Sequence, residues 1–456
     1  MKDLTQGPIL RQLSSLAGKF TLNIVLATLS SLINVYWVGR LGADAQAAMT
    51  LALNPVMLLL MLAPVLSVGV RVLVAQAVGG RDSARAGRVF NEAFGASLIV
   101  MTLIAGVLWP NRLAFGSLLT ADPATASLIA AYLRWLIPSV VLQVPGAVIG
   151  ASLAGTGNLR PGLLVQAGAL VLNVTLPPIL MFGWLGAPRL GIEGAGLASL
   201  LTGVAGLGFL LLYTAGGRSD LRLQPRLWLA RPTALWQVLR IGLPTGLEGG
   251  VLACYMTLVT VLLRPFGPVE QAAIGVASRL LQVALIPLMA LGAAASVLSG
   301  HNFGAGLGRR VQEIFRATLI LGLILAPLLC VALNLFSRSL SGVFSDDPAV
   351  VEGCTRFLQI VSFSLIPTSV VMAAFSVLSG LGNTRASLVT TTVYTILVVV
   401  PAWFLARLAG FRPDWLWELM VGMTVLEMLM ALYFLRREFG RSVPTHASDR
   451  VAGSLA

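Results

Sequence analysis

Long apolar runs separated by short polar segments follow one another along the whole chain. The first run extends from about residue 16 to residue 38, which at about 1.5 Å of helix rise per residue is long enough to cross the hydrocarbon core of a bilayer. Eleven similar runs follow, at residues 46–75, 90–109, 126–151, 161–184, 192–214, 240–263, 270–299, 315–336, 352–377, 387–409 and 414–435. The pattern therefore predicts twelve transmembrane helices.

The composition excludes a water-soluble domain. Of the 456 residues, 57% are hydrophobic and 11% are charged, and the mean hydropathy is +0.88. Such values are typical of a protein that crosses the membrane many times. We therefore predict an all-α integral membrane protein.

One stretch of the chain occurs twice. Leu153–Arg160 reads LAGTGNLR and returns 225 residues later, in Leu378–Arg385, as LSGLGNTR. The same offset pairs Gly42 with Gly267, Arg85 with Arg310 and Asp122 with Asp347. Self-similarity over about half the chain indicates two homologous halves. Because each half has an even number of spans, both halves enter the membrane from the same side, and we predict two parallel six-helix repeats.

The repeat also predicts the domain organisation. We expect residues 1–214 to form the first six-helix lobe, residues 215–236 an arginine-rich cytoplasmic linker, and residues 237–456 the second lobe with a short cytoplasmic tail. Lysine and arginine concentrate in loops on the side of both termini, so the positive-inside rule predicts cytoplasmic termini, in a bacterial inner membrane. The same distribution accounts for the formal charge of +13 without a nucleic-acid partner.

Polar side chains fall on stripes within the apolar runs. Asn23 and Asn34 are eleven residues apart, or three helical turns, and so share a face of the first span. Such stripes either line a wet cavity or join neighbouring helices through hydrogen bonds of about 1 kcal/mol each. Several stripes together favour a cavity for a small-molecule substrate. The residues predicted to line it are Asn23, Asn34, Gln166, Asn173, Tyr255, Arg279, Gln282, Gln359 and Ser362.

Two glutamates lie well inside predicted spans and are candidates for binding a coupling ion, whereas Glu92 and Glu418 lie near span ends, where a charge can reach the interface. Glu248 follows Arg240 by eight residues, which places it roughly 12 Å into the bilayer. Glu427 lies thirteen residues into the last span. A buried carboxyl group is suited to bind a proton or a sodium ion and to exchange it for substrate. The alternative is a structural ion pair, for example between Glu248 and Arg279.

No pattern of residues indicates an enzyme. The chain has two histidines, His301 and His446, and no HExxH sequence or pair of aspartate-rich motifs. We therefore expect no catalytic residues, no metal and no cofactor other than the coupling ion. We expect a monomer among membrane lipids. A passive channel remains the alternative from a different functional class.

Several segments resemble the multidrug and toxic compound extrusion (MATE) family over nearly the whole chain. They are Val38–Gly42, Val74–Gly80 at the end of the second span, Ile241–Pro244 at the start of the seventh, and the two Gly-Asn-x-Arg turns at Gly157–Arg160 and Gly382–Arg385. The resemblance implies a V-shaped pair of six-helix lobes. It also implies an ion-coupled antiporter that exports amphipathic, often cationic, compounds.

The chain departs from the family pattern at the acidic positions. Family members often have an acid in the first span where this chain has Asn34, and some have an aspartate in the fifth span where it has Pro177. Some also have a glutamate about one turn after the position of Glu248. These departures favour ion coupling in the second half of the chain. A lipid-linked sugar flippase of the same superfamily is the nearest alternative, but its members often have fourteen spans.

Overall fold

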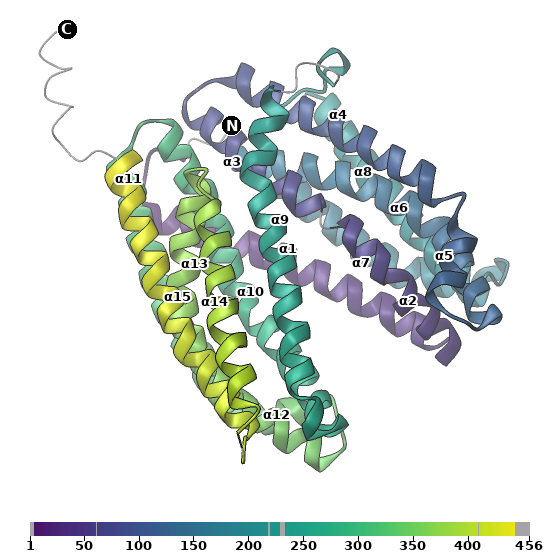
Figure 1. Cartoon of the computed structure of the whole chain (residues 1–456). Helices are drawn as coiled ribbons and strands as arrows, with labels where there is room; N and C mark the ends of the chain where they lie inside the picture. Colours follow the sequence, from purple (N-terminus) through teal and green to yellow (C-terminus); the bar gives the residue numbers. More distant parts are fainter. Residues whose placement is uncertain (1–3, 61, 218, 229–232, 409, 443–456) are drawn as a thin grey trace, which may run out of the picture. The chain divides into compact units, whose positions relative to one another are not determined.

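The structure is a computed structural model that describes residues 4–60, 62–217, 219–228, 233–408 and 410–442. All regular secondary structure in these residues is helical (Figure 1). Twelve of the helical segments in the described part of the chain are long and apolar enough to cross a membrane. The predicted fold class, an all-α membrane protein with twelve spans, is confirmed.

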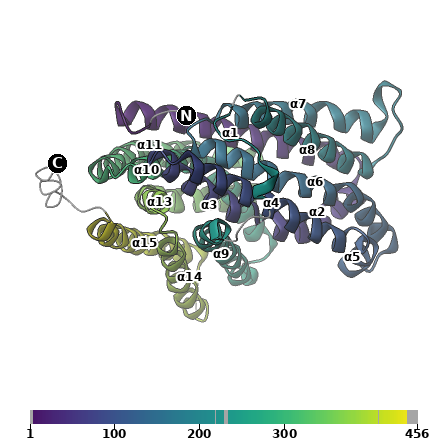
Figure 2. The same ribbon diagram turned by 90° about the horizontal axis from the view of Figure 1, so that it is seen from above.

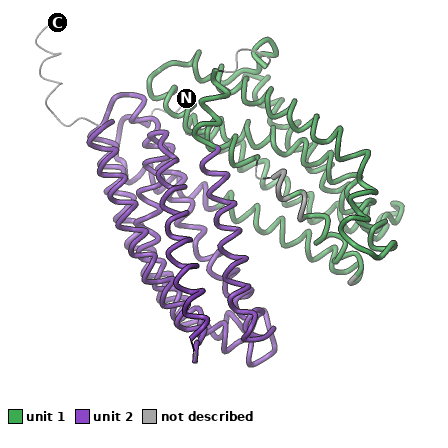
Figure 3. Tube along the Cα trace, in the orientation of Figure 1, with its two compact units in different colours: residues 1–3, 22–242 green, residues 4–21, 243–456 purple. Residues whose placement is uncertain are grey.

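The chain divides into two compact units, drawn in two colours in Figure 3. Unit 1 contains Leu22–Gly242, and unit 2 contains Leu4–Thr21 with Leu243–Ala456. Helix α1 (Ile9–Gly39) therefore contributes to both units, as does α9 (Thr233–Leu262). The remaining helices of unit 1 are α2 (Ala43–Leu60), α3 (Leu62–Gly79), α4 (Ser83–Leu108), α5 (Arg112–Leu119), α6 (Pro123–Gly155), α7 (Arg160–Phe182), η1 (Trp184–Gly186), α8 (Ile192–Ala215) and η2 (Pro225–Leu227).

The remaining helices of unit 2 are η3 (Arg264–Phe266), α10 (Pro268–Gly304), α11 (Gly308–Gly342), α12 (Pro348–Val361), η4 (Ser362–Ser364), α13 (Leu365–Gly380), α14 (Arg385–Leu405) and α15 (Pro413–Ser442). Helices α14 and α15 lie side by side, as Figures 1 and 2 both show. In unit 1, α6 is the central helix, because it contacts α2, α3, α4, α5 and α8.

The helices of the two halves begin at equivalent positions. Helix α6 begins at Pro123 and α12 at Pro348, and α7 begins at Arg160 and α14 at Arg385. Both pairs reproduce the 225-residue offset of the sequence repeat. The helix boundaries are therefore set by local sequence signals that both halves share.

One such signal is an Asp-Pro pair at the helix start. The side chain of Asp122 accepts hydrogen bonds from the backbone N–H groups of Ala124 and Thr125, and that of Asp347 accepts one from Ala349 at 2.9 Å. Each aspartate thereby satisfies N–H groups that have no partner within the helix. Proline at the first helical position lacks an N–H group and has a suitable φ angle, so it favours the same start.

The repeated Gly-Asn turn ends the preceding helix in both units. Gly157 and Gly382 have φ angles of +79° and +88°, which glycine adopts without the strain that a Cβ atom would cause. The asparagine that follows each glycine fixes the turn to a later helix. Asn158 donates to the Tyr213 hydroxyl at 3.0 Å, and Asn383 donates to a carboxylate oxygen of Glu438, the repeat equivalent of Tyr213, at 2.7 Å.

The first ten residues of α9 pack within unit 1 through two glycines. A Cβ atom on Gly242 would lie 1.7 Å from the Val65 carbonyl oxygen, and one on Gly69 would lie 2.2 Å from the Val238 carbonyl oxygen. Backbones can approach this closely only where a side chain is missing. In unit 2, the segment before α1 is held by α10 and α11. Arg310 Nη2 donates to the Gly7 carbonyl at 3.1 Å, and Asn302 Nδ2 donates to that of Leu4 at 3.2 Å.

Large apolar side chains remain exposed on the outer helices. Leu103 and Val107 of α4 are 66% and 64% exposed, and Leu335 of α11 is 74% exposed. Apolar surface of this extent is unfavourable in water but matches the hydrocarbon of a bilayer. The chain is therefore a multi-pass membrane protein.

Candidate functional site

Glu248 lies near the middle of α9 and faces α14. The Ser387 hydroxyl donates to Oε2 of Glu248 at 2.9 Å, and the Thr391 hydroxyl lies 3.4 Å from Oε1. Ser387 and Thr391 are one helical turn apart, so both hydroxyls point from the same face of α14. Within the described part of the chain, no ion pair joins Glu248 to Arg279. The structural ion pair considered from the sequence does not form in this structure.

The hydroxyl partners suit both protonation states of Glu248. The Ser387 hydroxyl also lies 2.8 Å from the Thr384 carbonyl oxygen, a second acceptor for its single proton. When Glu248 is ionised, Ser387 can donate to the carboxylate. When Glu248 is protonated, Ser387 can donate to Thr384 and accept from the carboxylic acid, because a hydroxyl is both donor and acceptor. A proton can thus be bound or released at Glu248 without leaving a buried polar atom unpaired.

A pair of tyrosines lies farther along the same helices. Tyr255 follows Glu248 by two turns on α9, and its hydroxyl lies 3.4 Å from that of Tyr394 on α14. The two ring centroids are 5.7 Å apart. The Tyr394 hydroxyl is also in hydrogen-bonding contact with Thr424 on α15. The tyrosines therefore connect α9, α14 and α15 through one chain of hydroxyl groups.

Glu427 completes this group of polar side chains. It follows Thr424 by one turn on α15, and its carboxyl group lies within electrostatic range of Glu248 and of both tyrosine hydroxyls. We define the C-terminal polar cluster as Glu248, Tyr255, Ser387, Thr391, Tyr394, Thr424 and Glu427. All of its members lie on α9, α14 and α15 of unit 2. The structure thus brings together the two acids that the sequence singled out, along with Tyr255.

The predicted cavity residues on α1 and α7 lie within unit 1. The Nδ2 atom of Asn23 lies 3.8 Å from the position that a Cβ atom on Gly162 of α7 would take. Asn173 is buried and donates to the Ala169 carbonyl of its own helix at 2.8 Å. The Oδ1 atom of Asn34 is buried and has no hydrogen-bond partner among the described residues. Gln166 on α7 is half-buried.

The other predicted cavity residues of unit 2 are distributed over different surroundings. Arg279 and Gln282 are exposed on α10, and Gln359 is exposed on α12. Ser362 is fully buried, and its hydroxyl accepts from Asn334 Nδ2 of α11 at 2.6 Å. Ser362 thus belongs to a separate hydrogen-bonded group between α11 and η4. Its use in substrate binding stays a prediction, as does that of the exposed residues.

Sequence reasoning missed four members of the C-terminal polar cluster, namely Ser387, Thr391, Tyr394 and Thr424. A signal for three of them was present, because Ser387, Thr391 and Tyr394 follow the i, i+4, i+7 spacing of one helix face. Hydroxyl side chains are common in membrane helices, where they bond to the carbonyl one turn earlier, and this concealed the stripe. Thr390 and Thr392, which make such bonds, lie directly beside it.

Known proteins share both the sequence pattern and the fold. The MatE family model matches residues 20–179 and 244–404. The chain belongs to the MatE family. The two matched segments are separated by about the repeat offset, so one family unit occurs in each half of this MatE protein. The predicted family is therefore confirmed.

The curated relatives are transporters. The chain is 25% identical over 460 residues to a FAD transporter of Shewanella oneidensis, covering 98% of this chain and all of that protein. It is 21% identical to the multidrug export protein MepA of Staphylococcus aureus, covering 94% of this chain and 95% of that protein. The family and these relatives are transporters and not enzymes.

Solved structures of MATE transporters have the same fold. A MATE protein in the straight conformation superposes with a TM-score of 0.88 at 21% identity, covering 96% of this chain and 98% of that chain. A transporter of the wider superfamily from Pyrococcus furiosus, described as having a binding pocket of reverse polarity, gives a TM-score of 0.88 at 20% identity, covering 97% and 98%. At these identities the likeness establishes the fold alone.

Proposed function

We propose that this MatE protein is an ion-coupled antiporter that exports amphipathic, cationic small molecules by alternating access. The coupling ion is a proton or a sodium ion, and it binds at the C-terminal polar cluster of unit 2. The relative MepA is a multidrug export protein. We extend multidrug export to this chain, and specify cationic substrates, because the carboxyl groups of the C-terminal polar cluster suit the binding of a cation.

The observation that carries the proposal is the environment of Glu248. Its carboxyl group is paired with hydroxyls at 2.9 and 3.4 Å and with no cation among the described residues. A membrane-embedded carboxylate without a counter-ion has a large desolvation cost, which a bound proton or sodium ion removes. Glu427 adds a second carboxyl group within electrostatic range of Glu248. Binding of an ion and binding of a cationic substrate therefore compete for the same negative charge.

We further propose that the protein works as a monomer in a bacterial inner membrane with both termini in the cytoplasm. The basic loops on the side of the termini support this orientation. In this orientation the turns at Asn158 and Asn383 face the cytoplasm. Single cysteines introduced at these positions should not react with a membrane-impermeant thiol reagent added to intact cells. Labelling from the outside would contradict the proposed topology.

Transport by purified protein in sealed vesicles tests the function. Wild-type protein should accumulate a fluorescent organic cation against the concentration gradient of the dye when a proton or sodium gradient is imposed. The ion whose gradient drives this accumulation is the coupling ion. Glu248→Gln keeps the size and hydrogen-bonding capacity of the side chain but removes the exchangeable charge, so it should still bind the dye, with lower affinity, but not accumulate it. Equilibration of the dye without accumulation by the wild type would instead indicate a passive channel.

Two arginines support a second candidate, export of an anionic flavin nucleotide. The relative from Shewanella oneidensis is a FAD transporter. In this chain, Nε of Arg71 on α3 is buried without a hydrogen-bond partner among the described residues, and Arg279 is exposed on α10. Guanidinium groups within spans suit phosphate groups. Vesicles that accumulate FAD but no organic cation would favour this candidate, and Arg71→Gln should then abolish accumulation.

A further inference from the structure

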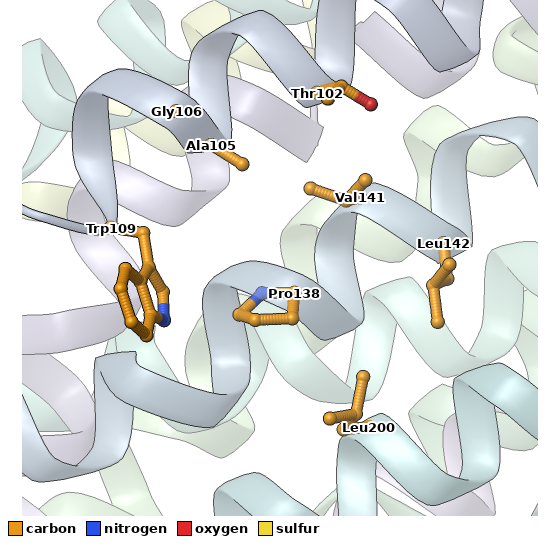
Figure 4. Close-up of a pocket in the computed structure, with 8 residues that line it drawn as sticks. All are labelled: Thr102, Ala105, Gly106, Trp109, Pro138, Val141, Leu142 and Leu200. Atoms are coloured by element: carbon orange, nitrogen blue, oxygen red, sulfur yellow. The ribbon is translucent and has the colours of Figure 1, made fainter.

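An apolar groove lies within unit 1, between α4, α6 and α8. Its volume is about 420 Å³, which is within the range of pockets that hold small ligands. Its wall is almost entirely carbon, as the close-up in Figure 4 shows. The lining residues are Thr102, Ala105, Gly106, Trp109, Pro138, Val141, Leu142 and Leu200. A wall of this kind suits a hydrocarbon chain.

The groove is formed by one missing side chain and one proline. A Cβ atom on Gly106 would meet no protein atom within 4 Å, so the space beside this residue is open. Pro138 has no N–H group, which leaves the Arg134 carbonyl without its usual partner one turn later. The indole Nε1–H of Trp109 donates to that carbonyl at 3.0 Å. Trp109 is thereby fixed at the end of the groove.

Positive charge gathers around Trp109 at this end. The Arg112 guanidinium lies 4.7 Å from the centroid of the Trp109 ring and donates to the Trp109 carbonyl at 2.9 Å. Arg134 lies 3.8 Å from Glu193, which balances its charge. Arg112 makes no ion pair with any described residue. One uncompensated guanidinium therefore lies directly beside the apolar groove.

The charged end of the groove lies at the level of a membrane interface. Helix α4 ends at Leu108 and α8 begins at Ile192, next to the Glu193 that contacts Arg134. Tryptophan and arginine are enriched where membrane helices meet the headgroups. The rest of the groove extends from there into the apolar span. Because α4 is the third span, this end lies on the membrane face opposite to the one where α1 begins.

The residues that form the groove are replaced at the equivalent positions of the second half of the chain. At the repeat equivalents of Gly106 and Pro138 it has Val331 and Phe363. The equivalent of Trp109 is Asn334, which binds Ser362. The equivalent of Arg112 is Ser337, so the guanidinium is missing as well. The side chains that open the groove in unit 1 and the guanidinium beside it are therefore replaced together in unit 2.

We propose that this groove binds one membrane phospholipid, with an acyl chain between α4, α6 and α8 and the phosphate group at Arg112. The apolar wall excludes a strongly polar ligand, and the uncompensated guanidinium complements the charge of a phosphodiester. An acyl chain below a phosphate matches both features at their observed positions. The bound lipid fills a gap in the packing of unit 1 on its outer face.

Lipid retention by matched variants tests this proposal. Purified protein in mild detergent is incubated with phosphatidylglycerol or with phosphatidylethanolamine, and bound lipids are counted by native mass spectrometry. Wild-type protein should retain one molecule of either lipid more tightly than the rest. Gly106→Leu places a side chain in the groove and should weaken this binding at least about 10-fold, as expected for displacement of a buried chain.

Gly87→Leu is the control, since Gly87 lies on the same helix and a Cβ atom there also meets nothing within 4 Å. It should leave lipid binding unchanged. Arg112→Gln should weaken binding about 10-fold through loss of a charged hydrogen bond, and inorganic phosphate should not compete. Equal lipid retention by wild type and Gly106→Leu would overturn the proposal. So would loss of dye binding in Gly106→Leu with lipid binding intact, since the groove would then hold substrate.

Discussion

Asn23 on α1 and Glu248 on α9 are equivalent positions in the two halves, and each faces the third residue of a later helix, Gly162 of α7 or Ser387 of α14. The backbone geometry is thus repeated, while the chemistry changes from amide and glycine to carboxylate and hydroxyl. Three other members of the C-terminal polar cluster, Thr391, Tyr394 and Glu427, also gain a hydroxyl or a carboxyl group, while Tyr255 and Thr424 correspond to side chains that already carry a hydroxyl. Tyr255, Thr391, Tyr394, Thr424 and Glu427 correspond to Ser30, Gln166, Ala169, Ser199 and Thr202.

This comparison separates what the repeat conserves from what it varies. The helix starts, the Asp-Pro caps and the Gly-Asn turns recur, because they determine where the chain bends and are needed in both halves. At the positions equivalent to the C-terminal polar cluster, carboxyl groups occur in the second half alone, and each carries a high cost in a membrane. The proposed coupling needs one ion site per molecule, which is consistent with neutral side chains at the same positions of the first half.

The largest expected effect is the difference between acids and amides at equivalent positions. Glu248→Gln should reduce ion-driven accumulation to the level of vesicles without protein, because no exchangeable charge remains at the site. Asn23→Leu should retain most of the activity. Glu427→Gln should slow accumulation, since the second carboxyl group of the cluster is lost. Rates of dye accumulation in vesicles measure all three, and equal losses in Asn23→Leu and Glu248→Gln would remove the distinction between the halves.

Copying the acid into unit 1 sharpens the comparison. Asn23→Glu combined with Gly162→Ser recreates the contact between Glu248 and Ser387, but the second acid and the tyrosines are still missing. We expect that this pair of changes will not restore accumulation in the Glu248→Gln background. Restoration would mean that a single carboxyl group with one hydroxyl is sufficient, and that the rest of the cluster has a different role.

Gly242 allows the start of α9 to pack closely within unit 1, so adding a side chain there should lower the stability of the protein. Gly242→Ala places a Cβ atom within 1.7 Å of a backbone oxygen, and such overpacking costs about 1–3 kcal/mol. Gly249→Ala, on the same helix, meets nothing within 4 Å and should be neutral or slightly stabilising. Thermal unfolding in detergent measures both. A melting temperature for Gly242→Ala equal to that of Gly249→Ala would contradict the close approach.

The tyrosine pair should have a moderate effect. Tyr394→Phe removes the hydroxyl that joins Tyr255 to Thr424 while leaving the ring in place. The lost hydrogen bonds correspond to about 1 kcal/mol each, so transport should slow about 5-fold or more. Tyr433→Phe, on an exposed residue of α15, is the control and should be silent. Full activity of Tyr394→Phe would exclude the tyrosine pair from the mechanism.

The smallest effect concerns the two helix caps, which differ at one residue. The side chain of Thr125 donates to Asp122, and this hydrogen bond lowers the pKa of Asp122 below its ordinary value of 3.8. The equivalent of Thr125 in the second half is Val350. Because the folded pKa is below the unfolded one, the stabilisation is present above the ordinary pKa and is lost as the pH falls through the folded pKa.

Thr125→Val should therefore lower the melting temperature slightly at neutral pH and not at strongly acidic pH. Melting curves of wild type and Thr125→Val across this range measure the difference. A difference that grows on acidification would reverse the sign and contradict the assignment.

Most of the fold followed from the sequence because the signals are local. Twelve apolar runs and a fixed offset determine the number and order of the membrane spans, and the capping residues Asp122 and Asp347 determine where α6 and α12 begin, without long-range information. The sequence did not show that α5 is a separate short helix before α6, because its eight residues, Arg112–Leu119, are too few to form an apolar run of membrane length.

The polar cluster could be predicted only in part. Glu248 and Glu427 were recognisable because a charge within an apolar run is rare. Their mutual proximity was not, since it depends on how α9, α14 and α15 pack. Tyr394 was missed because an isolated tyrosine in an apolar run is compatible with ordinary packing. The groove in unit 1 was also not predicted, because it depends on the absence of a side chain at Gly106.

The most direct test of the central claim is to measure the ions that substrate displaces from the purified protein. Substrate is added to protein in weakly buffered detergent solution while pH and sodium electrodes record release. Wild type and Asn23→Leu should release protons or sodium ions in proportion to bound substrate, and Glu248→Gln should bind substrate but release neither. Release of the same number of ions by Glu248→Gln and by the wild type would contradict an ion site in the second half of the chain.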